Sequence, residues 1–186
     1  WISDISDASR LDAELARDDS EKLDLGRLLE NIVSAAREVR RNKGIALTLT
    51  QAKLPQGAKG YFVTGHDLRL GQVITNLIEN ARSFVPDPGG KVEIKLEQAG
   101  DMVRILVEDN GPGIRAEKVD RIFERFYTDR PQGEAFGQNS GLGLSISRQI
   151  IEAHNGTIIA ENMIDAKTTV ITGARFIVSL PAWRKA

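Results

Sequence analysis

The stretch Met-Val-Arg-Ile-Leu-Val-Glu-Asp-Asn-Gly-Pro-Gly, residues 102–113, places a glycine-rich turn directly after a predicted strand. Val103, Ile105 and Val107 recur at every second position, as expected of a strand with one buried face. Glycines after a strand let the backbone approach a ligand closely, and the Asp109 carboxylate can accept a hydrogen bond from an amino group such as that of adenine. An ordinary Asn-Gly turn explains the same residues, so this segment alone leaves both interpretations open.

The residues on both sides of this stretch show further strand and helix patterns. Residues 91–97 are predicted to pair with it around a tight turn at Gly100 and Asp101. Asp24 is a candidate N-cap for the first helix of the domain. The spacing of apolar residues predicts helices over residues 25–44, 67–84 and 143–154, and strands at residues 45–50, 61–63, 157–161 and 175–180.

Two segments are predicted to be irregular. Residues 110–139 form a long connection with one short helix near residues 116–123, and a connection of that length inside a compact domain is usually functional. Residues 163–173 are predicted to be a variable loop. The sum predicts an α+β fold, a two-layer α/β sandwich whose mixed, mostly antiparallel sheet is covered by helices on one face.

The composition favours one compact domain and excludes several functions. The chain has 186 residues, of which 41% are hydrophobic and 27% charged. With 25 Lys and Arg against 26 Asp and Glu, the chain has no net attraction for nucleic acid, so no nucleic-acid partner is expected. The absence of cysteine excludes disulfides, thiol nucleophiles and Cys-bound zinc. No apolar run approaches the roughly 18 residues of a membrane span, so we expect a soluble piece, excised from a longer protein because it opens on Trp1.

Two further segments carry patterns that suit a nucleotide. Asn76 and Asn80 lie one turn apart on a predicted helix, and their amide oxygens suit a hard cation such as Mg2+, although such asparagines are more often solvated surface residues. Ser-Gly-Leu-Gly-Leu at residues 140–144 opens another helix, where free backbone amides bind phosphate. It is neither a Rossmann fingerprint nor a Walker loop, because position 146 is Ile and no Gly-Lys-Ser/Thr occurs.

The order of these segments resembles the GHKL ATPase superfamily, with its Bergerat fold, and within it the catalytic ATP-binding domain of sensor histidine kinases. The likeness runs from about Asp24 to Pro181. Residues 126–131 and 136–147 are similar to alphaproteobacterial sensor kinases of the ChvG, ExoS and BvrS type. The resemblance places the N box at residues 67–81, the first glycine box at 109–113, the F box at 122–127 and the second glycine box at 140–144.

The resemblance also implies a division of the chain. Residues 1–20 resemble the end of the second helix of a dimerisation and phosphoacceptor domain, and residues 21–186 the catalytic domain with its flexible ATP lid. The histidine that receives phosphate is absent, so the fragment is expected to hold no catalytic residue and to be unable to phosphorylate itself. His66 is expected in the turn before a helix, and His154 near a helix end, where a cationic imidazole complements the dipole.

The roles of the site residues follow from the resemblance. Asn80 is expected to coordinate Mg2+ on the triphosphate, Asn76 to support its phosphate end, and Asp109 to receive the adenine amino group. Gly111 and Gly113 let adenine sit against the strand end. The other nucleotide-binding candidates are Ser83, Phe84, Ile114, Tyr127, Arg130, Ser140, Gly141, Leu142, Gly143 and Leu144.

The resemblance implies a more specific location or role for several of these candidates. Ile114 is expected near adenine, the amides of residues 141–143 at phosphate, and Leu144 in the core. Tyr127 suits either a nucleotide contact or ordinary packing. Phe123 and Phe126 are expected to anchor the lid in the core.

This sequence departs from the commoner family pattern at several positions, one of which is Asn139 in place of a usual glycine. Ser83 stands where Lys or Arg is frequent, and Phe84 replaces Tyr. Thr128 replaces the Arg that commonly follows the F-box tyrosine, so Arg130 is the candidate for reaching the γ-phosphate. Ala174 replaces a common Thr near adenine. Arg82 and Arg125 are weaker substitute cations.

The implied function is to bind ATP and Mg2+ and to donate the γ-phosphate to a histidine of the absent dimerisation domain, for relay to an aspartate of a response regulator. The resemblance places the domain in the cytoplasmic portion of a bacterial inner-membrane sensor kinase that works as a homodimer. Two alternatives remain. One is a GHKL ATPase of the gyrase, HSP90 or MutL type, which carries Glu where Asn76 stands, and the other is a non-catalytic nucleotide-sensing module.

Overall fold

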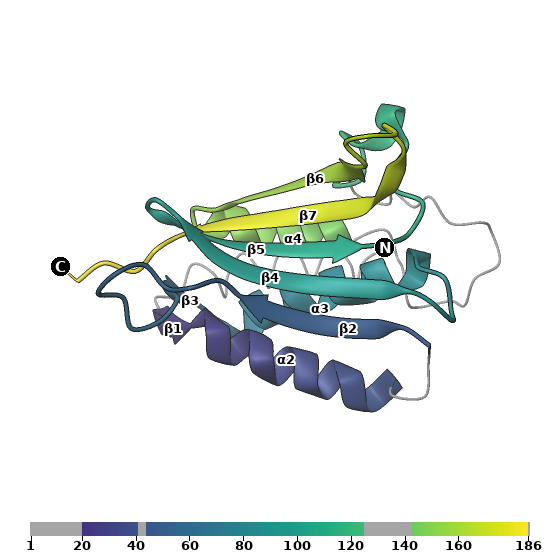
Figure 1. Cartoon of the computed structure of the whole chain (residues 1–186). Helices are drawn as coiled ribbons and strands as arrows, with labels where there is room; N and C mark the ends of the chain where they lie inside the picture. Colours follow the sequence, from purple (N-terminus) through teal and green to yellow (C-terminus); the bar gives the residue numbers. More distant parts are fainter. Residues whose placement is uncertain (1–19, 41–43, 125–142, 186) are drawn as a thin grey trace, which may run out of the picture.

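The computed structural model describes residues 20–40, 44–124 and 143–185. A five-stranded sheet with the order β2-β4-β5-β7-β6 forms one layer, and helices pack on it as the second (Figure 1). The strands are β2 (Ala46–Gln51), β4 (Lys91–Ala99), β5 (Met102–Asp109), β6 (Thr157–Ile164) and β7 (Ile171–Pro181), and the helices are α2 (Leu25–Arg40), α3 (Asp67–Phe84) and α4 (Gly143–Ala153). Only β2 and β4 pair in parallel within this sheet. The predicted mixed, mostly antiparallel sandwich is therefore confirmed.

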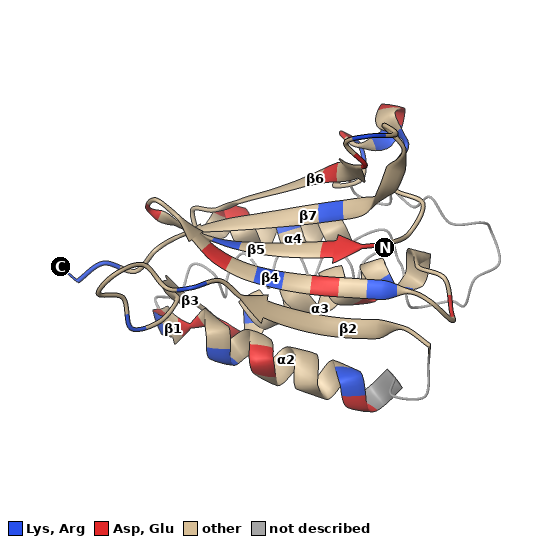
Figure 2. Ribbon diagram, in the orientation of Figure 1, with Lys and Arg blue, Asp and Glu red and all other residues tan. Residues whose placement is uncertain are grey.

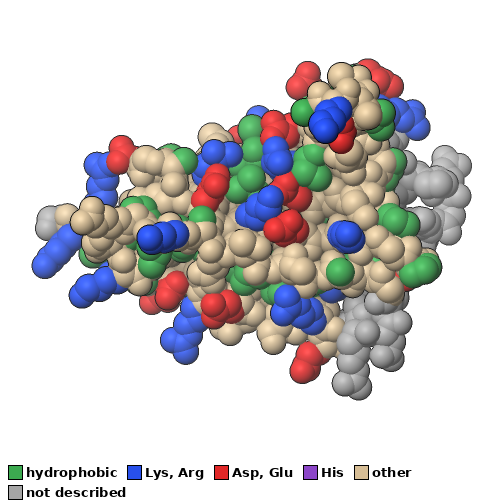
Figure 3. All heavy atoms as spheres, viewed as in Figure 1, with side chains coloured by type: hydrophobic (Ala, Val, Ile, Leu, Met, Phe, Trp, Pro, Cys, Tyr) green, Lys and Arg blue, Asp and Glu red, His purple; other side chains and the backbone are tan. Residues whose placement is uncertain are grey.

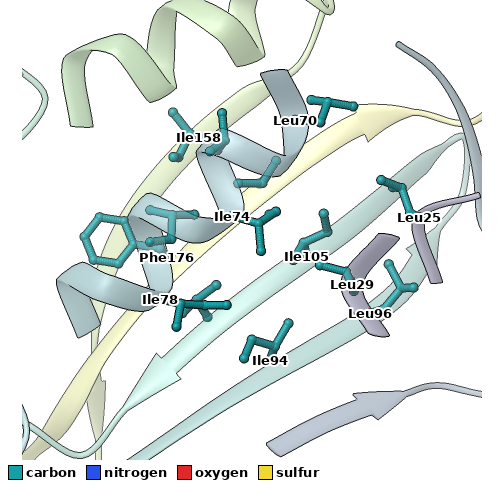
Figure 4. Packing of buried hydrophobic residues seen from close by; sticks show 14 of the residues in the cluster. Leu25, Leu29, Leu70, Ile74, Ile78, Ile94, Leu96, Ile105, Ile158 and Phe176 are labelled. Atoms are coloured by element: carbon teal, nitrogen blue, oxygen red, sulfur yellow. The ribbon is translucent and has the colours of Figure 1, made fainter. Parts of the chain in front are cut away.

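The hydrophobic core lies between the sheet and the helices (Figure 4). The alternation seen in the sequence puts Ile94 and Leu96 of β4 and Ile105 of β5 on the inner face, each at most 1% exposed. The apolar stripe of α3 packs against them through residues that include Ile74 and Ile78. Each such side chain stabilises the fold by about 1.5–3 kcal/mol relative to leaving it exposed.

The first turn of α2 confirms the predicted N-cap. Asp24 Oδ1 accepts a hydrogen bond from the Arg27 amide at 3.2 Å. The sequence did not predict β1 (Glu21–Asp24), which pairs antiparallel with β3 (Phe62–Gly65) in a separate two-stranded sheet. Leu23 is the only apolar residue of β1, so no alternation marks the strand.

The last residues of the described chain close onto this small sheet. Ala182 forms a bridge with Val63, and the Trp183 amide donates to the Phe62 carbonyl at 2.7 Å. The Lys22 ammonium lies 3.8 Å from the centre of the Trp183 ring. Residues that begin and end the described chain therefore meet at one pole, near the start of β5 (Figure 1).

The structure corrects the bounds of one predicted irregular segment and the helix type in the other. The loop predicted at residues 163–173 is shorter than expected, because β6 continues to Ile164 and β7 begins at Ile171, which leaves residues 165–170 as the connection. Pairing between the two strands supplies the backbone hydrogen bonds there, which a sequence without regular alternation does not reveal. The short helix predicted near residues 116–123 is one 3-10 turn, η1 (Ala116–Lys118), followed by turns. Among the described helices, none is long and apolar enough to cross a membrane.

Candidate functional site

Asp109 ends β5 on the inner face of the sheet and is only 5% exposed. Its Oδ1 atom accepts hydrogen bonds from the Gly111 amide at 2.9 Å and the Ala174 amide at 3.3 Å. Burial raises the pKa of this carboxyl, although the two amides act in the opposite direction. Within the described part of the chain no hydrogen bond reaches Oδ2, so this oxygen is left to accept one from a ligand.

The glycine-rich turn after Asp109 is packed too closely for side chains. A Cβ atom on Gly111 would lie 3.0 Å from the Phe84 carbonyl oxygen at the end of α3. Gly113 has φ +82°, and a Cβ there would lie 2.5 Å from the Ile171 side chain. The first glycine box is thus packed tightly between α3 and the β6-β7 hairpin, and glycine is needed there because a side chain would collide with these neighbours.

Two residues to which the sequence assigned no role in the site shape the same place. Gly173 of β7 passes so close to β5 that a Cβ on it would collide with the Asp109 carbonyl oxygen. The Asn162 side chain of β6 bonds both backbone groups of Ile114, at 2.7 Å each. Neither was predictable locally, because each contact joins segments about fifty or more positions apart in the chain.

Asn76 lies where α3 meets the start of α4. Its Nδ2 atom is 3.5 Å from the Ser147 hydroxyl, and Ser147 is fully buried. A Cβ on Gly143, the first residue of α4, would lie 3.9 Å from the same nitrogen. The structure therefore brings the N-box asparagine to the helix start that was predicted to hold phosphate. Ser147 is a further contact that the sequence did not indicate.

Asn80 lies one turn beyond Asn76 and is half-buried, and its carbonyl oxygen accepts a hydrogen bond from the Ser83 hydroxyl at 2.6 Å. The described ranges contain no cluster of three His, Cys, Asp or Glu side chains able to hold a metal ion. A single amide oxygen at Asn80 fits Mg2+ that arrives with a triphosphate, because this ion prefers few protein oxygens together with phosphates and water.

The Arg82 side chain packs against α2. Its guanidinium is buried and donates to the Ala36 carbonyl of α2 at 3.1 Å. This placement against α2 removes it as a substitute cation for phosphate. Phe84, at the end of α3, is 38% exposed beside the glycine-rich turn.

The remaining predicted residues divide into described and undescribed positions. Ile114 and Leu144 are partly buried against the core. Phe123 packs edge to face on Phe176, with ring centres 6.1 Å apart, as an anchor of the following segment would. Predictions that lie outside the described residues concern Arg125, Phe126, Tyr127, Arg130, Asn139, Ser140, Gly141 and Leu142, the rest of the lid, and residues 1–19.

Directly behind the site, the open face of the sheet carries an ion-pair network (Figures 2 and 3). Glu108 lies 2.6 Å from the Lys95 ammonium and 2.8 Å from the Arg175 guanidinium, which also contacts Glu161 at 3.0 Å. Burial opposes ionisation of Glu108, but the two cations outweigh it and lower the pKa of this carboxyl. Neighbouring residues 108 and 109 thus face opposite sides of the sheet with opposite pKa shifts.

His66 and His154 form a contact between the start of α3 and the end of α4. The His66 amide donates to His154 Nε2 at 3.1 Å, and His154 Nδ1 lies 2.7 Å from the Ile150 carbonyl oxygen. These partners require a neutral imidazole with its proton on Nδ1. Burial lowers the pKa of His154, and the nearby His66 adds to that effect. The expectation of a cationic His154 is therefore wrong.

Acidification is expected to weaken the fold through His154. Because its pKa is lower in the folded state, the unfolded chain binds more protons as the pH falls. The stability that the neutral ring contributes is complete above the unfolded pKa of about 6.5 and is lost as the pH falls below it. Urea unfolding at about pH 7.5 and about pH 5.5 measures this loss. The control His154→Gln keeps an acceptor without titrating, and an equal loss in both proteins would contradict the prediction.

Comparison with known proteins decides the family. The sequence profile of the histidine kinase-, DNA gyrase B- and HSP90-like ATPases matches residues 65–184, which include Asn76, Asp109 and Gly143. The chain belongs to this ATPase family. Within the family, the profile covers the site from the start of α3 to the end of β7.

Similar proteins narrow the type of ATPase domain. The chain is 58% identical to the sensor protein ChvG of Rhizobium meliloti (strain 1021) over 182 residues, which is 97% of this chain and 31% of that protein. It thus spans less than a third of the length of that relative. The solved catalytic domain of the histidine kinase ThkA is 29% identical with a TM-score of 0.71, covering 88% of this chain and 95% of that one.

A second solved structure contains a nucleotide analogue. Full-length ShkA in complex with AMPPNP is 25% identical, with a TM-score of 0.73 over 96% of this chain and 34% of that one. Together the comparisons confirm the expected resemblance to the catalytic domains of sensor histidine kinases, including the ChvG type. They also confirm the expected GHKL architecture of this ATPase-family domain.

Proposed function

We propose that this domain binds ATP with Mg2+ and donates the γ-phosphate to a histidine of a longer sensor kinase. The observation that carries the proposal is the pairing of two separate half-sites. A buried Asp109 with one oxygen left for a base amino group lies at the end of β5. The amide of Asn76 lies against Ser147 at the start of α4, where phosphate would be held.

The proposed reaction requires little covalent chemistry from the residues of this domain. Phosphoryl transfer depends mainly on positioning and on charge stabilisation, so a domain that holds the nucleotide in one orientation performs most of the task. Asn80 would hold the Mg2+, which neutralises phosphate charge when bound. Asp109 fixes the base at the other end. The similar protein ShkA has been solved in complex with AMPPNP, which supports a nucleotide as the ligand.

The partners follow from the same proposal. The acceptor histidine belongs to a dimerisation domain, whose second helix would end in residues 1–20, and an aspartate of a response regulator receives the phosphate next. We place the domain on the cytoplasmic side of a bacterial inner-membrane sensor that acts as a homodimer. The likeness to a ChvG sensor protein, of which this chain spans 31%, supports a longer parent.

Phosphotransfer in trans tests the proposal. The chain is incubated with γ-labelled ATP, Mg2+ and the separately produced dimerisation domain of the Rhizobium meliloti ChvG protein. Acid-labile label is expected on the added domain and not on this chain. The variant Asn80→Ala should abolish most of the transfer, because an amide oxygen for Mg2+ is lost.

Three other outcomes would contradict the proposal. Nucleotide binding without any transfer would favour a non-catalytic sensing module. Phosphate released to water at the same rate with and without the acceptor domain would favour an ATPase of the gyrase type. Acid-labile label on this chain would move the acceptor into the fragment itself.

A further inference from the structure

Asn162 lies in the same row of the sheet as Asp109. In the register of β6 and β7, Asn162 pairs with Ala174, and the Ala174 amide in turn donates to Asp109 Oδ1 at 3.3 Å. The row therefore crosses from β6 through β7 to the end of β5. All three residues are at least partly buried on the side where the helices pack.

The Asn162 carboxamide holds the far end of the glycine-rich turn. Its Oδ1 accepts from the Ile114 amide and its Nδ2 donates to the Ile114 carbonyl, each at 2.7 Å. Within the described chain these are the hydrogen bonds that fix the Ile114 backbone. The near end of the turn is fixed by Gly111 on Asp109. One side chain on β6 and one on β5 thus hold the turn at its two ends.

Asn110 adds a further anchor within the turn through the Lys91 amide and the Gly89 carbonyl, but these bonds do not reach β6. The turn contains Gly111 and Gly113, and glycine loses more backbone entropy than other residues when it is held in place. Gly113 also packs against Asn162, since a Cβ on it would lie 2.7 Å from the Asn162 Oδ1 atom. Without the carboxamide, the segment that ends in Ile114 would lose the hydrogen bonds that join it to β6 in the described structure.

Few side chains could replace Asn162 in its contact with Ile114. A donor and an acceptor must reach the N–H and C=O of one residue together, and a carboxamide provides both. Asp offers only acceptors when ionised, so its second oxygen would face the Ile114 carbonyl oxygen. Ala offers neither group.

We propose that Asn162 is a positioning residue for the nucleotide base. It does not touch the ligand but holds Ile114 at a fixed place relative to Asp109, so that the base slot exists before binding. The inference rests on the proposed nucleotide function. It also makes the β6-β7 hairpin a part of the binding site.

The test measures ADP affinity in a fully folded protein. Calorimetry is performed well below the unfolding transition, which circular dichroism locates for each variant, so that a loss of global stability alone leaves Kd unchanged. Asn162→Ala is expected to raise Kd roughly tenfold, which corresponds to about 1.4 kcal/mol. Asn162→Asp, which keeps the acceptor for the Ile114 amide, serves as a second variant and decides the question by the same criterion if the alanine variant does not fold.

Thr172→Val is the matched control. The Thr172 hydroxyl donates to the Met163 carbonyl at 3.3 Å in the same hairpin and makes no hydrogen bond with the described residues of the turn. The Kd of this variant for ADP should stay within about twofold of the Kd of the original protein, which is a smaller change than the loss of one hydrogen bond produces. Equal weakening by Thr172→Val and Asn162→Ala would overturn the inference, because a loosened hairpin would then explain both.

Coupling to Asp109 provides a second measurement. If Asn162 acts by placing the base against Asp109, its replacement should cost less in an Asp109→Asn background, whereas independent sites add. If the original protein binds ADP and both Asn162 variants bind it with the same affinity, the inference is overturned. Absence of ADP binding by the original protein would instead overturn the proposed function.

Discussion

Replacing Asp109 by Asn is expected to raise the Kd for ADP by roughly 10- to 150-fold, or about 1.5–3 kcal/mol, the range of a hydrogen bond to a charged group. The oxygen of the new carboxamide could still accept from the amides of Gly111 and Ala174, as Asp109 Oδ1 does. The other carboxylate oxygen becomes an amide nitrogen, so a donor would face the amino group of the base. Calorimetric titration with ADP measures the change, and an unaltered Kd would remove Asp109 from the base site.

The same substitution should act on folding in the opposite direction. Because burial raises the pKa of Asp109, its negative charge disfavours the folded state at neutral pH, and acidification relieves this cost. A neutral Asn should therefore leave the melting temperature unchanged or raise it. Weaker binding combined with unimpaired stability separates a ligand contact from a structural residue.

Glu108→Gln is the matched comparison for Asp109→Asn. The side chain is equally buried but faces the open side of the sheet, where it pairs with Lys95 and Arg175. Its lowered pKa means that the carboxylate stabilises the fold at neutral pH and loses that contribution as the pH falls. The variant should melt earlier and bind ADP nearly as before. The loss is modest, about 1 kcal/mol or less, because both cations are partly solvated.

Gly173→Ala is expected to cost about 3 kcal/mol or more of folding free energy and to impair nucleotide binding as well. The new Cβ would collide with the Asp109 carbonyl oxygen and approach the backbone of Asn110. These atoms belong to a neighbouring strand and cannot move as a flexible side chain would. Relief requires β5 and β7 to separate where they form the base site. Urea unfolding and ADP titration measure the two effects, and a variant within about 1 kcal/mol of the original would show that the strands yield easily.

Gly71→Ala, in contrast to Gly173→Ala, is expected to stabilise the fold. Gly71 lies inside α3, and a Cβ there would meet only the ends of the Ile32 and Leu28 side chains, at 3.8 and 3.9 Å. Alanine lowers the conformational entropy of the unfolded chain and should stabilise the helix by about 0.5–1 kcal/mol. The two substitutions are chemically identical, so a difference in sign isolates the contact at β5.

The sequence predicted those parts of the molecule whose pattern is local. The apolar stripe of α3 and the alternation in β4 and β5 each lie within one segment, and all three elements form as expected. The ends of β6 and β7 were missed because Asn162, Met163 and Gly173 show no alternation, and their structure comes from pairing with each other. Periodicity cannot report a strand that is specified by its partner.

The candidate site divides in the same way. Asp109 and Asn76 stand in recognisable motifs, and the structure places both of them beside the elements that the motifs imply. Gly173, Asn162 and Ser147 support those residues from distant segments, and no spacing rule connects them. The neutral state of His154 likewise depends on the His66 amide, 88 positions away.

The pole where Ala182 and Trp183 close onto β3 lies at the opposite end of β5 from Asp109. At about 3.4 Å per residue, β5 sets the base site about 24 Å from that pole. A segment joined to the domain at β1 or after Trp183 would therefore be attached at that pole, far from the base site. A rotation of the domain by about 20° about that pole would move the base site by about 8 Å, because β5 separates the two by about 24 Å. Such a rotation would carry the base site through space without any change in the contacts around Asp109.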